Sequence, residues 1–385
     1  MSYQPGFKTT PNATILVTGS SGFVGARLVE MLLERKAAHV LCMDITPPSS
    51  SQRARFLSAA KDDESKITIL SGSQGDISNS KEVLKAFASV DKIDVVYHIA
   101  ALVGPFHAYE TYQQVNYYGT LHILKACQQC NVPRLIYSSS PSTRFDGRDI
   151  EGVKECDLPI PTTFLATYAE TKAKGEIAVR DACCEDLLTI SVAPHQVYGP
   201  HDPLFLPALL ETAGSGKLRV FGKGDNKISV CFVDNYCHGL MCGADVLEPN
   251  HASLGKFYII TDGPEQYFWR ILNQAVVAMG FTDLFSKFHL PIPLLMTLAY
   301  VANVLGWILG KTFKLNPFNV KMLTIHRYFD IQNSCKDLKY EPLVPFEDAW
   351  KLTIDWCKEH WLPEYKERQE KGIGSAIVGK DKKTR

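Results

Sequence analysis

A glycine-rich turn between a short apolar segment and a helical pattern constrains the fold of this chain most strongly. Residues Thr14–Thr18 have strand character, and Phe23–Lys36 carry apolar residues at helical spacing. Gly19, Gly22 and Gly25 stand between and at the start of these segments. The first glycine permits a tight turn, the second lets the backbone approach a pyrophosphate, and the third allows close packing of helix on strand. Their place at the first strand–helix junction predicts a dinucleotide-binding unit rather than an ordinary turn.

The alternation of strand and helix patterns continues to about Pro194 and predicts an α/β fold with a doubly wound parallel sheet of the Rossmann type. The strands are expected at Thr14–Thr18, His39–Asp44, Ile67–Leu70, Val95–His98, Arg134–Ser138 and Leu188–Ala193. The helices are expected at Phe23–Lys36, Ser80–Ser89, Glu110–Cys130 and Thr167–Cys184.

After Pro194, proline and glycine interrupt the pattern, as at Gly199–Pro200 and Gly222–Gly224, which predicts a smaller C-terminal substrate-binding lid. We therefore expect four parts: a flexible N-terminus (1–12), an NAD-binding domain (13–193), a substrate-binding part (194–362) and a charged tail (363–385) that is disordered from Lys366.

Composition excludes some functions. Lys and Arg number 41 and Asp and Glu also 41, so no global positive charge would recruit nucleic acid. The 11 cysteines lack the spacing of a disulfide framework, which favours a reducing compartment. Cys127 and Cys130 have no second pair at zinc spacing, and no metal is predicted. His195, His201 and His238 are dispersed, and we expect them to be structural.

The cofactor expected from these patterns is NAD. The glycine spacing is GxxGxxG, which is typical of the short-chain dehydrogenase superfamily. Asp44 ends the second expected strand, where a carboxylate accepts hydrogen bonds from ribose hydroxyls and repels a 2′-phosphate. No arginine follows in Ile45–Pro48 to compensate such a phosphate, so NAD is favoured over NADP.

The expected catalytic pair is Tyr168 and Lys172, which lie one helical turn apart on the same face. A free phenol has a pKa of about 10 and is a poor base unless a cation stabilises its phenolate. Lys172 can supply that charge. Ser140, at the end of an expected strand, can orient the substrate oxygen, with Ser139 as the alternative register. Asn116 is expected to hold its helix and a water in place.

The chain from about Ala13 to Trp361 resembles the 3β-hydroxysteroid dehydrogenase family of extended short-chain dehydrogenases. The segments Ser138–Gly147 and Pro194–Pro203 resemble members that act on 4α-carboxysterols. The other matching segments are His98–Ala101, Tyr168–Glu176, Phe232–Gly239 and Asp337–Pro342.

The resemblance implies oxidation of a sterol 3β-hydroxyl, followed by loss of carbon dioxide through an enolate. It also implies further cofactor-binding residues beside the glycines and Asp44, namely Phe23, Val24, Asp76, Ile77, Ala100, Pro194 and Val197. The chain departs from the family pattern at Ala193, where Arg is usual, at Ser229, where Asp is usual, and at Pro141 and Arg144. These departures put the particular sterol in doubt more than the cofactor.

An uncharged apolar stretch spans Leu290–Gly310, close to the roughly 20 residues that a membrane-spanning helix needs. A membrane-inserted or interfacial helix is favoured here over a buried lid helix, since a sterol would enter from lipid. The final residues Lys382–Arg385 resemble a dilysine retrieval signal. We expect the endoplasmic reticulum membrane with the catalytic part facing the cytosol; a lipid droplet or the cytosol is the alternative.

Other functions stay open at this point. One is a 3β-hydroxy-5-ene steroid dehydrogenase with isomerase activity, and another is a nucleotide-sugar epimerase or dehydratase of the same fold. A third is a catalytically inactive, cofactor-sensing scaffold, against which the intact Tyr168, Lys172 and Ser140 argue. A homodimer or a complex of sterol-demethylating enzymes is a possible assembly.

Overall fold

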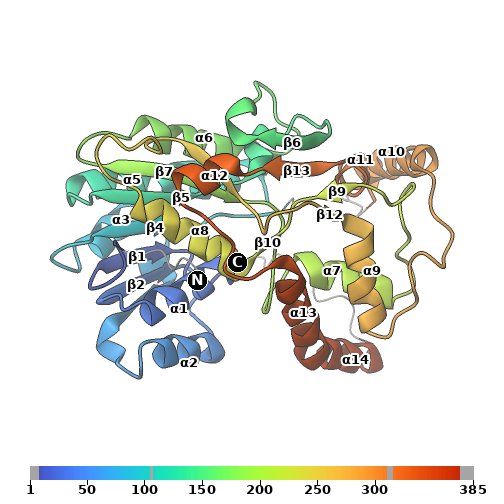
Figure 1. The fold of residues 1–385 in the computed structure, drawn as a ribbon, viewed down its shortest axis with the longest axis horizontal. Coiled ribbons are helices and arrows are strands. Elements are labelled where there is room, and N and C mark those ends of the chain that lie inside the picture. The colour runs from blue at the N-terminus through green and yellow to red at the C-terminus, as the bar shows by residue number, and fades with distance from the viewer. Residues whose placement is uncertain (1–7, 105–106, 310–314, 373–385) are drawn as a thin grey trace.

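A seven-stranded parallel sheet forms the larger part of the computed structural model, which describes residues 8–104, 107–309 and 315–372. The strand order is β11-β7-β5-β4-β1-β2-β3 (Figure 1), so the chain winds outward from β1 in both directions. The strand bounds are β1 Thr14–Thr18, β2 His39–Asp44, β3 Ile67–Ser71, β4 Val95–His98, β5 Arg134–Ser138, β7 Leu188–Pro194 and β11 Phe257–Ile260.

Helices cover both faces of this sheet, as the fold class predicted from the sequence requires. Leu28 and Val29 of α1 and Leu240 of α8 pack with alternate sheet residues in one apolar cluster. Val83 of α3, Ile123 of α5 and Val179 of α6 pack in the cluster on the other face. The helix bounds are α1 Phe23–Glu34, α2 Ser50–Ala59, α3 Ser80–Phe87, α5 Gly119–Gln129, α6 Thr167–Asp181 and α8 Val233–Asp245.

The expected helix over 110–130 is present with one interruption. It begins as α4 (Tyr109–Tyr112), widens to a π-helical segment over Gln113–Tyr118 and continues as α5. Asn116 lies inside the π-helical segment, a feature that often marks functional sites. The expected strands are all present, whereas α2 and the seventh strand, β11, were not predicted.

A second, smaller sheet lies beside the first and has the order β12-β9-β13-β6. Its strands are β6 Ile150–Lys154, β9 Lys227–Ile228, β12 Gln266–Tyr267 and β13 Arg327–Asp330, and β8 Val197–Tyr198 pairs separately with β10 Cys231–Phe232. The small sheet, made mostly of residues after 194, contains β6 from before that residue. The large sheet, made mostly of residues up to 194, contains β11 from after it. The boundary expected at 193 and 194 stays a prediction, since the strands interleave across it.

Most helices of the C-terminal part lie around the small sheet, away from the large one, whereas α12 lies beside the large sheet (Figure 1), where Ser334 donates to the Ile259 carbonyl of β11. Their bounds are α7 Phe205–Gly214, α9 Phe268–Ala278, α10 Ile292–Leu309, α11 Pro317–Met322, α12 Gln332–Asp337, α13 Phe346–Trp356 and α14 Leu362–Glu370. Asn235 of α8 ties this part to the large sheet, because its Nδ2 donates to Asp262 Oδ1 at 2.8 Å and to the Val344 carbonyl at 2.8 Å.

Both ends of the described chain contact the rest of the protein. Thr9 donates its backbone N–H to Asp245 Oδ1 at 2.9 Å, and Thr10 is fully buried. At the other end, α14 continues to Glu370. Helix α14 is held there by the buried Tyr365 ring, which stacks on Trp361 with a centroid distance of 4.9 Å. The flexible N-terminus and the disordered tail stay predictions.

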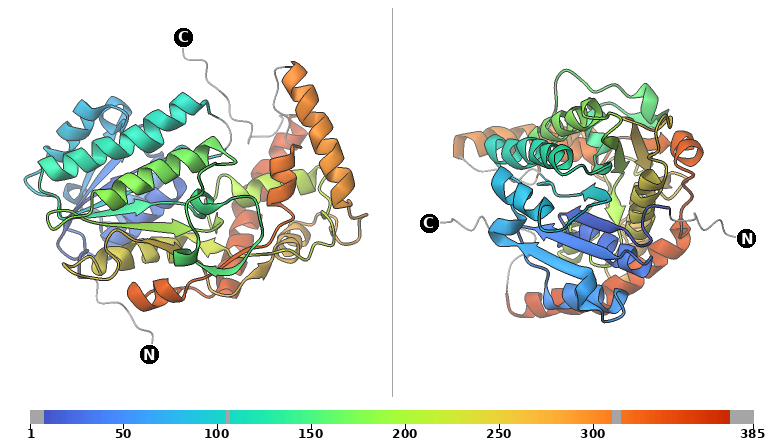
Figure 2. Two further views of the ribbon diagram at one scale, coloured as in Figure 1. Left: turned by 90° about the horizontal axis from the view of Figure 1, so that it is seen from above. Right: turned by 90° about the vertical axis from the view of Figure 1, so that its left-hand side faces the viewer.

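Helix α10 covers most of the apolar stretch noticed in the sequence and stands at the outer edge of the molecule (Figure 2). Its inner side contributes Leu295 and Ala299 to a small cluster with Val320 of α11. Within the ranges that the structure describes, no helix combines the length and apolarity needed to cross a bilayer. Gly310 and the dilysine-like residues 382–385 lie outside those ranges.

Candidate functional site

The carboxyl end of β1 forms a cradle that has room only for glycine. Gly19 has φ +71°, and a Cβ there would lie 2.7 Å from the backbone N of Ala100. A Cβ on Gly25 would lie 1.9 Å from the Gly19 carbonyl oxygen. Helix α1 starts at Phe23 without a side-chain cap at Gly22, which leaves its first N–H groups pointing toward the cradle. Such an arrangement fits the pyrophosphate of a dinucleotide.

Asp44 lies beside this cradle because β2 is the neighbour of β1 in the sheet. Its Oδ2 accepts a hydrogen bond from the Ser21 N–H at 3.0 Å, and its Oδ1 accepts one from Thr46 at 2.8 Å. Burial raises the pKa of Asp44, and these two hydrogen bonds oppose the rise. The carboxylate is therefore held against the glycine loop, where a ribose would have to lie.

The other expected cofactor residues follow the carboxyl ends of neighbouring strands. Ala100 follows β4 and donates its N–H to Thr18 Oγ1 at 3.1 Å. The Asp76 side chain bonds within its own loop, because its Oδ1 accepts a hydrogen bond from the Ser78 hydroxyl at 2.7 Å. Of the rest, Phe23 and Val24 open α1, Ile77 packs beside Gly119, Pro194 ends β7 and Val197 begins β8.

Tyr168 stands near the start of α6 and is partly buried. Burial raises the pKa of Tyr168 to about 12, and a hydrogen bond with the Ser140 side chain opposes that rise. Ser140 Oγ lies 2.8 Å from Ser142 Oγ in the short helical turn Pro141–Arg144 that follows β5. The structure thus brings the Tyr168 phenol together with the Ser140 hydroxyl, which the sequence predicted to orient the substrate oxygen.

Ser139, the alternative to Ser140, serves a different group. Its Oγ donates to Glu176 Oε2 at 2.6 Å, inside the protein. Glu176 also forms a buried ion pair with Arg144, whose Nη2 is 2.5 Å from Oε1. Ser139 and Arg144 therefore stabilise one buried carboxylate, and Ser140 alone of the two serines reaches Tyr168.

Lys172 is fully buried one turn after Tyr168. Its Nζ donates to the Ser138 carbonyl oxygen at 2.5 Å and lies 4.1 Å from the centroid of the Tyr137 ring. Burial lowers the pKa of Lys172 to about 7, and the negative charge of Glu176 opposes that change. The ammonium group is thus costly to keep charged, which is typical of functional lysines.

Asn116 positions the segment that follows β4. Its Oδ1 accepts from the Leu102 N–H at 2.8 Å, while its Nδ2 donates to the Leu102 carbonyl at 3.1 Å and to Thr171 Oγ1 at 3.3 Å. With its side chain shared between Leu102 and α6, Asn116 is a positioning residue rather than one that contacts the reacting atoms.

An apolar pocket of about 80 Å³ adjoins Tyr168. It lies between α6, the turn after β5 and the small sheet. Its lining is Pro141, Ser142, Phe145, Ile150, Leu165, Ala166, Tyr168, Ala169, His195, Phe318, Met322, Arg327 and Phe329. Sequence reasoning missed Arg327, and it took His195 as structural only. His195 Nδ1 is indeed 2.6 Å from the Ser229 carbonyl oxygen, but the ring also lines the pocket.

The residues that depart from the family pattern take up structural positions near this pocket. Ala193 is buried in β7 and pairs with Ile259 of β11. Ser229 Oγ accepts the Phe329 N–H at 3.1 Å, which fixes β13 to the loop after β9. Arg144 is the partner of Glu176. None of these contacts involves Tyr168.

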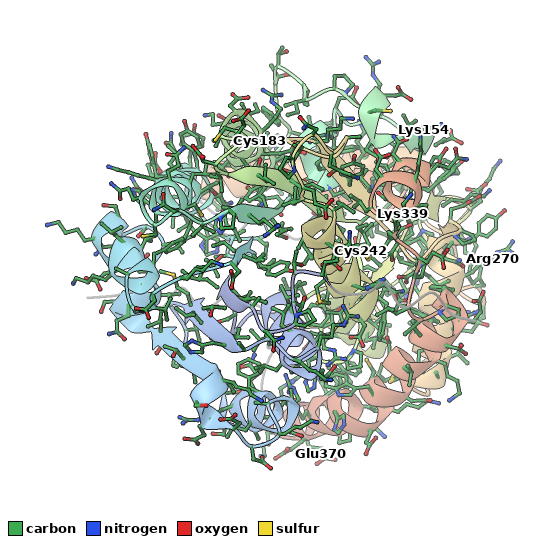
Figure 3. All side chains as sticks on the ribbon, turned by 60° about the vertical axis from the view of Figure 1, so that its left-hand side comes forward. Lys154, Cys183, Cys242, Arg270, Lys339 and Glu370 are labelled. Atoms are coloured by element: carbon green, nitrogen blue, oxygen red, sulfur yellow. The ribbon has the colours of Figure 1, made fainter. Side chains whose placement is uncertain are left out.

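The described residues contain no group of His, Cys, Asp and Glu side chains that could hold a metal ion. Cys127 is buried in α5, and Cys242 lies among packed side chains in the interior, whereas Arg270 and Glu370 lie at the periphery (Figure 3).

The match to protein families covers most of the chain. A model of the 3-beta hydroxysteroid dehydrogenase/isomerase family matches residues 16–291. A 3beta-hydroxysteroid-dehydrogenase/decarboxylase of Arabidopsis thaliana is 32% identical over 359 residues, which cover 88% of this chain and 78% of the relative. The decarboxylating sterol-4-alpha-carboxylate 3-dehydrogenase of Homo sapiens is 30% identical over 345 residues, which cover 88% and 86%.

Solved structures share the fold at lower identity. An epimerase of Methanothermobacter thermautotrophicus has a TM-score of 0.69 and 20% identity, with 94% of this chain and 96% of that chain covered. A UDP-glucuronic acid 4-epimerase of Bacillus cereus, solved with UDP-glucuronic acid and NAD, has a TM-score of 0.66 and 23% identity, with 90% and 99% covered.

Proposed function

Because the chain belongs to the 3-beta hydroxysteroid dehydrogenase/isomerase family, we propose that it oxidises the 3β-hydroxyl of a 4α-carboxysterol with NAD and that carbon dioxide is then lost. The observation that carries this proposal is the position of Tyr168, which has a hydrogen bond with the Ser140 side chain, at an apolar pocket. A nucleotide sugar would require a polar pocket, whereas the lining here is mostly aromatic and aliphatic. The relatives named for sterol carboxylates support the same substrate class.

The residues that would hold NAD are the glycine loop, the amino end of α1 and Asp44. When bound, NAD supplies the acceptor for the hydride that leaves C3. The Tyr168 phenolate accepts the hydroxyl proton, while the Ser140 hydroxyl donates to the same substrate oxygen. Lys172 lowers the free energy of the phenolate by its positive charge. The product of this step is a ketone at C3.

The ketone makes the carboxylate labile, since it lies β to the carboxyl carbon. The bond between C4 and that carbon breaks, its electron pair moves to the C3 oxygen as an enolate, and carbon dioxide leaves. A proton added at C4 then completes the 3-oxosterol. The same side chains therefore suffice for the oxidation and for the loss of carbon dioxide that follows.

The assay supplies purified full-length protein with NAD and a 4α-carboxysterol labelled at the carboxyl carbon. We expect one NADH and one labelled carbon dioxide per turnover. NADH without carbon dioxide would contradict the decarboxylation, and NADH from 3β-hydroxy-5-ene steroids alone would favour the isomerase alternative. No NADH with any steroid, together with conversion of a UDP-sugar, would overturn the steroid proposal.

We also propose that the protein contacts a membrane through α10. The outward side chains Leu294, Leu298, Val301 and Leu305 are each about half exposed, and they recur at helical spacing. No charged residue interrupts Ile292–Leu309. A lipid surface would cover this apolar side and deliver a hydrophobic substrate. The endoplasmic reticulum as that membrane, and assembly with a second copy or with other sterol-demethylating enzymes, stay predictions.

A further inference from the structure

Helix α2 turns one amide side chain toward the glycine loop. Phe56 is the buried residue of this helix and packs in the apolar cluster that it shares with α1. Gln52 stands one turn before Phe56 and is half-buried, whereas its neighbours Ser51 and Arg53 are exposed. Because residues four apart share one face of a helix, the packing of Phe56 also directs Gln52 inward.

The Gln52 amide joins two loops that are separate in the chain. Its Nε2 donates to the Ser21 carbonyl oxygen in the glycine loop at 2.8 Å. Its Oε1 accepts the Ser49 N–H, at the end of the loop from β2 to α2, at 2.9 Å. Ser49 Oγ in turn accepts the Gln52 N–H at 3.2 Å, which completes a capping box. The amide oxygen therefore caps α2, and the amide nitrogen holds the glycine loop.

Ser21 is held on two sides, by Asp44 and by Gln52. Its N–H donates to Asp44 Oδ2 at 3.0 Å, and its carbonyl accepts from Gln52. The Ser21 hydroxyl is enclosed and has no hydrogen-bond partner among the described residues, so the backbone of Ser21 makes these contacts. Rotation of this backbone would break the hydrogen bond to Asp44. Gln52 therefore acts on the Asp44 carboxylate through Ser21.

The two arginines of α2 have carboxylate partners other than Asp44. Arg55 Nε is 2.7 Å from Glu30 Oε1, and Arg53 Nη2 is 4.0 Å from Glu64 Oε1. A 2′-phosphate on the adenosine ribose would therefore meet the negative charge of Asp44, whereas the ribose hydroxyls of NAD can donate to it. The orientation of this one carboxylate thus bears on both affinity for NAD and exclusion of NADP.

We propose that Gln52 is a positioning residue for the cofactor, which keeps the Asp44 carboxylate toward the adenosine ribose and thereby favours NAD over NADP. This inference rests on the NAD part of the proposed function and is independent of the sterol. The N–H groups of Ser21 and Thr46 fix the carboxylate, whose remaining lone pairs face the ribose hydroxyls. Without the Gln52 contact the carboxylate is free to rotate, so NAD loses a fixed acceptor and a 2′-phosphate meets less repulsion.

The test measures the dissociation constants of NAD and NADP by isothermal titration of the full-length protein without sterol. Gln52→Met removes both side-chain hydrogen bonds at similar size. We expect its dissociation constant for NAD to rise ~10-fold and that for NADP to change less than ~3-fold. A merely structural defect would weaken both dinucleotides alike, because they share the pyrophosphate and the glycine loop.

Two further variants separate the contact with Ser21 from the cap of α2. Gln52→Glu keeps an oxygen for the Ser49 N–H but places a second oxygen against the Ser21 carbonyl. It should also raise the dissociation constant for NAD ~10-fold, measured at ~0.5 M NaCl so that its added charge is screened. Ser49→Ala removes the hydroxyl half of the capping box and leaves the Gln52 side chain in place. It should change the dissociation constant for NAD less than ~2-fold.

Each result supports or overturns the role of Gln52. If Gln52→Met does not fold, Gln52→Glu decides, since it retains the cap. Unchanged NAD binding in Gln52→Glu, an equal loss with NAD and NADP, or a loss in Ser49→Ala as large as in Gln52→Met would overturn the positioning role. Wild-type protein that binds neither dinucleotide, or that prefers NADP, would instead overturn the NAD part of the proposed function.

Discussion

The Nζ of Lys172 donates a 2.5 Å hydrogen bond to the carbonyl oxygen of Ser138, the last residue of β5. This bond fixes the middle of α6 against the carboxyl end of the sheet, two residues before Ser140. Tyr168 lies one turn earlier in the same helix. The contact that joins α6 to the end of β5, between Tyr168 and Ser140 on either side, is thus made by a lysine whose charge is costly to bury.

We expect Tyr168→Phe to lower kcat by roughly 10²- to 10⁴-fold, because the group that accepts the hydroxyl proton is removed. NAD binding, measured by fluorescence titration, should not change, since the glycine loop and Asp44 are untouched. Tyr118→Phe, at an exposed tyrosine, is the matched control and should keep full activity. Full turnover by Tyr168→Phe would remove Tyr168 from the proposed chemistry.

The depressed pKa of Lys172 predicts a stability profile. Its pKa is about 7 when folded, against about 10.4 in an unfolded chain, so the unfolded state binds more protons between these values. Below pH 7, burial of the Lys172 charge lowers the free energy of unfolding by its full amount. This loss becomes smaller as the pH rises and disappears at about pH 10.4. The free energy of unfolding of Lys172→Met, relative to wild type, should therefore fall as the pH rises from 7 to 9.

Lys174→Met controls for this effect in the same helix. The Lys174 ammonium is paired with Glu170 at 2.7 Å, and its pKa lies above the usual value because Glu170 and Tyr109 accept its hydrogen bonds. Between pH 7 and 9, Lys174 is charged in both the folded and the unfolded protein. Its replacement should therefore change the free energy of unfolding by the same amount throughout this range. Urea denaturation at several pH values measures both variants, and a flat difference for Lys172→Met would contradict the buried charge.

Glu155, in the turn after β6, predicts the opposite dependence. Both of its carboxylate oxygens are buried without a hydrogen-bond partner, and burial raises its pKa to about 7. Burial of the ionised Glu155 carboxylate therefore lowers the free energy of unfolding by its full amount above pH 7. This loss is absent below the unfolded pKa of about 4.3, where the carboxyl group is protonated in both states. Glu155→Gln should be more stable than wild type at pH 8, by up to about 3 kcal/mol, and no more stable at pH 4.

The exposed Glu151 of β6 is the control for Glu155. Glu151→Gln should change the free energy of unfolding by less than about 0.5 kcal/mol at either pH. A stability gain in Glu155→Gln that did not depend on pH would show that the ionised carboxylate is not its cause.

The buried pair of Arg144 and Glu176 should behave as one unit. Arg144→Met leaves the Glu176 carboxylate buried with less compensation, and we expect a loss of about 3 kcal/mol in the free energy of unfolding. The double variant Arg144→Met/Glu176→Met should recover most of that loss. Arg148→Met breaks an exposed contact with Asp146 and should cost less than about 1 kcal/mol. Additive losses in the double variant would contradict the coupling.

The apolar side of α10 can be tested with vesicles of phosphatidylcholine. Wild type should co-float with them, and the double variant Leu298→Glu/Val301→Glu should not, because two charges would enter the lipid interface. Leu84→Glu/Leu352→Glu changes two exposed leucines on other helices and should still float. If Leu298→Glu/Val301→Glu still co-floats with vesicles, lipid is not what covers this side of α10. The same conclusion would follow if the substitutions abolished a dimer in detergent but left vesicle binding unchanged.

The local pattern of the sequence determined most of the large sheet and the cofactor end of the site. Strand β1, the glycine loop and the start of α1 are contiguous, and Asp44 ends the strand that pairs with β1, so the periodicity and glycine spacing predicted their place. Tyr168 and Lys172 share a helical turn and were likewise predictable. Strand β11 was not, because it lies beyond the punctuated region and joins the sheet only through β7.

Only the tertiary structure decided which side chains meet in the pocket. Ser139 and Ser140 are adjacent in the chain, and the sequence could not decide between them. The structure does, because the Ser139 hydroxyl donates to Glu176. Arg327 reaches Tyr168's pocket from 159 residues further along the chain, on a strand too short and too distant to carry a sequence signal. Spacing along a chain can place groups within one helix or turn, whereas a binding pocket depends on contacts between elements far apart in sequence, which the packing of both sheets sets.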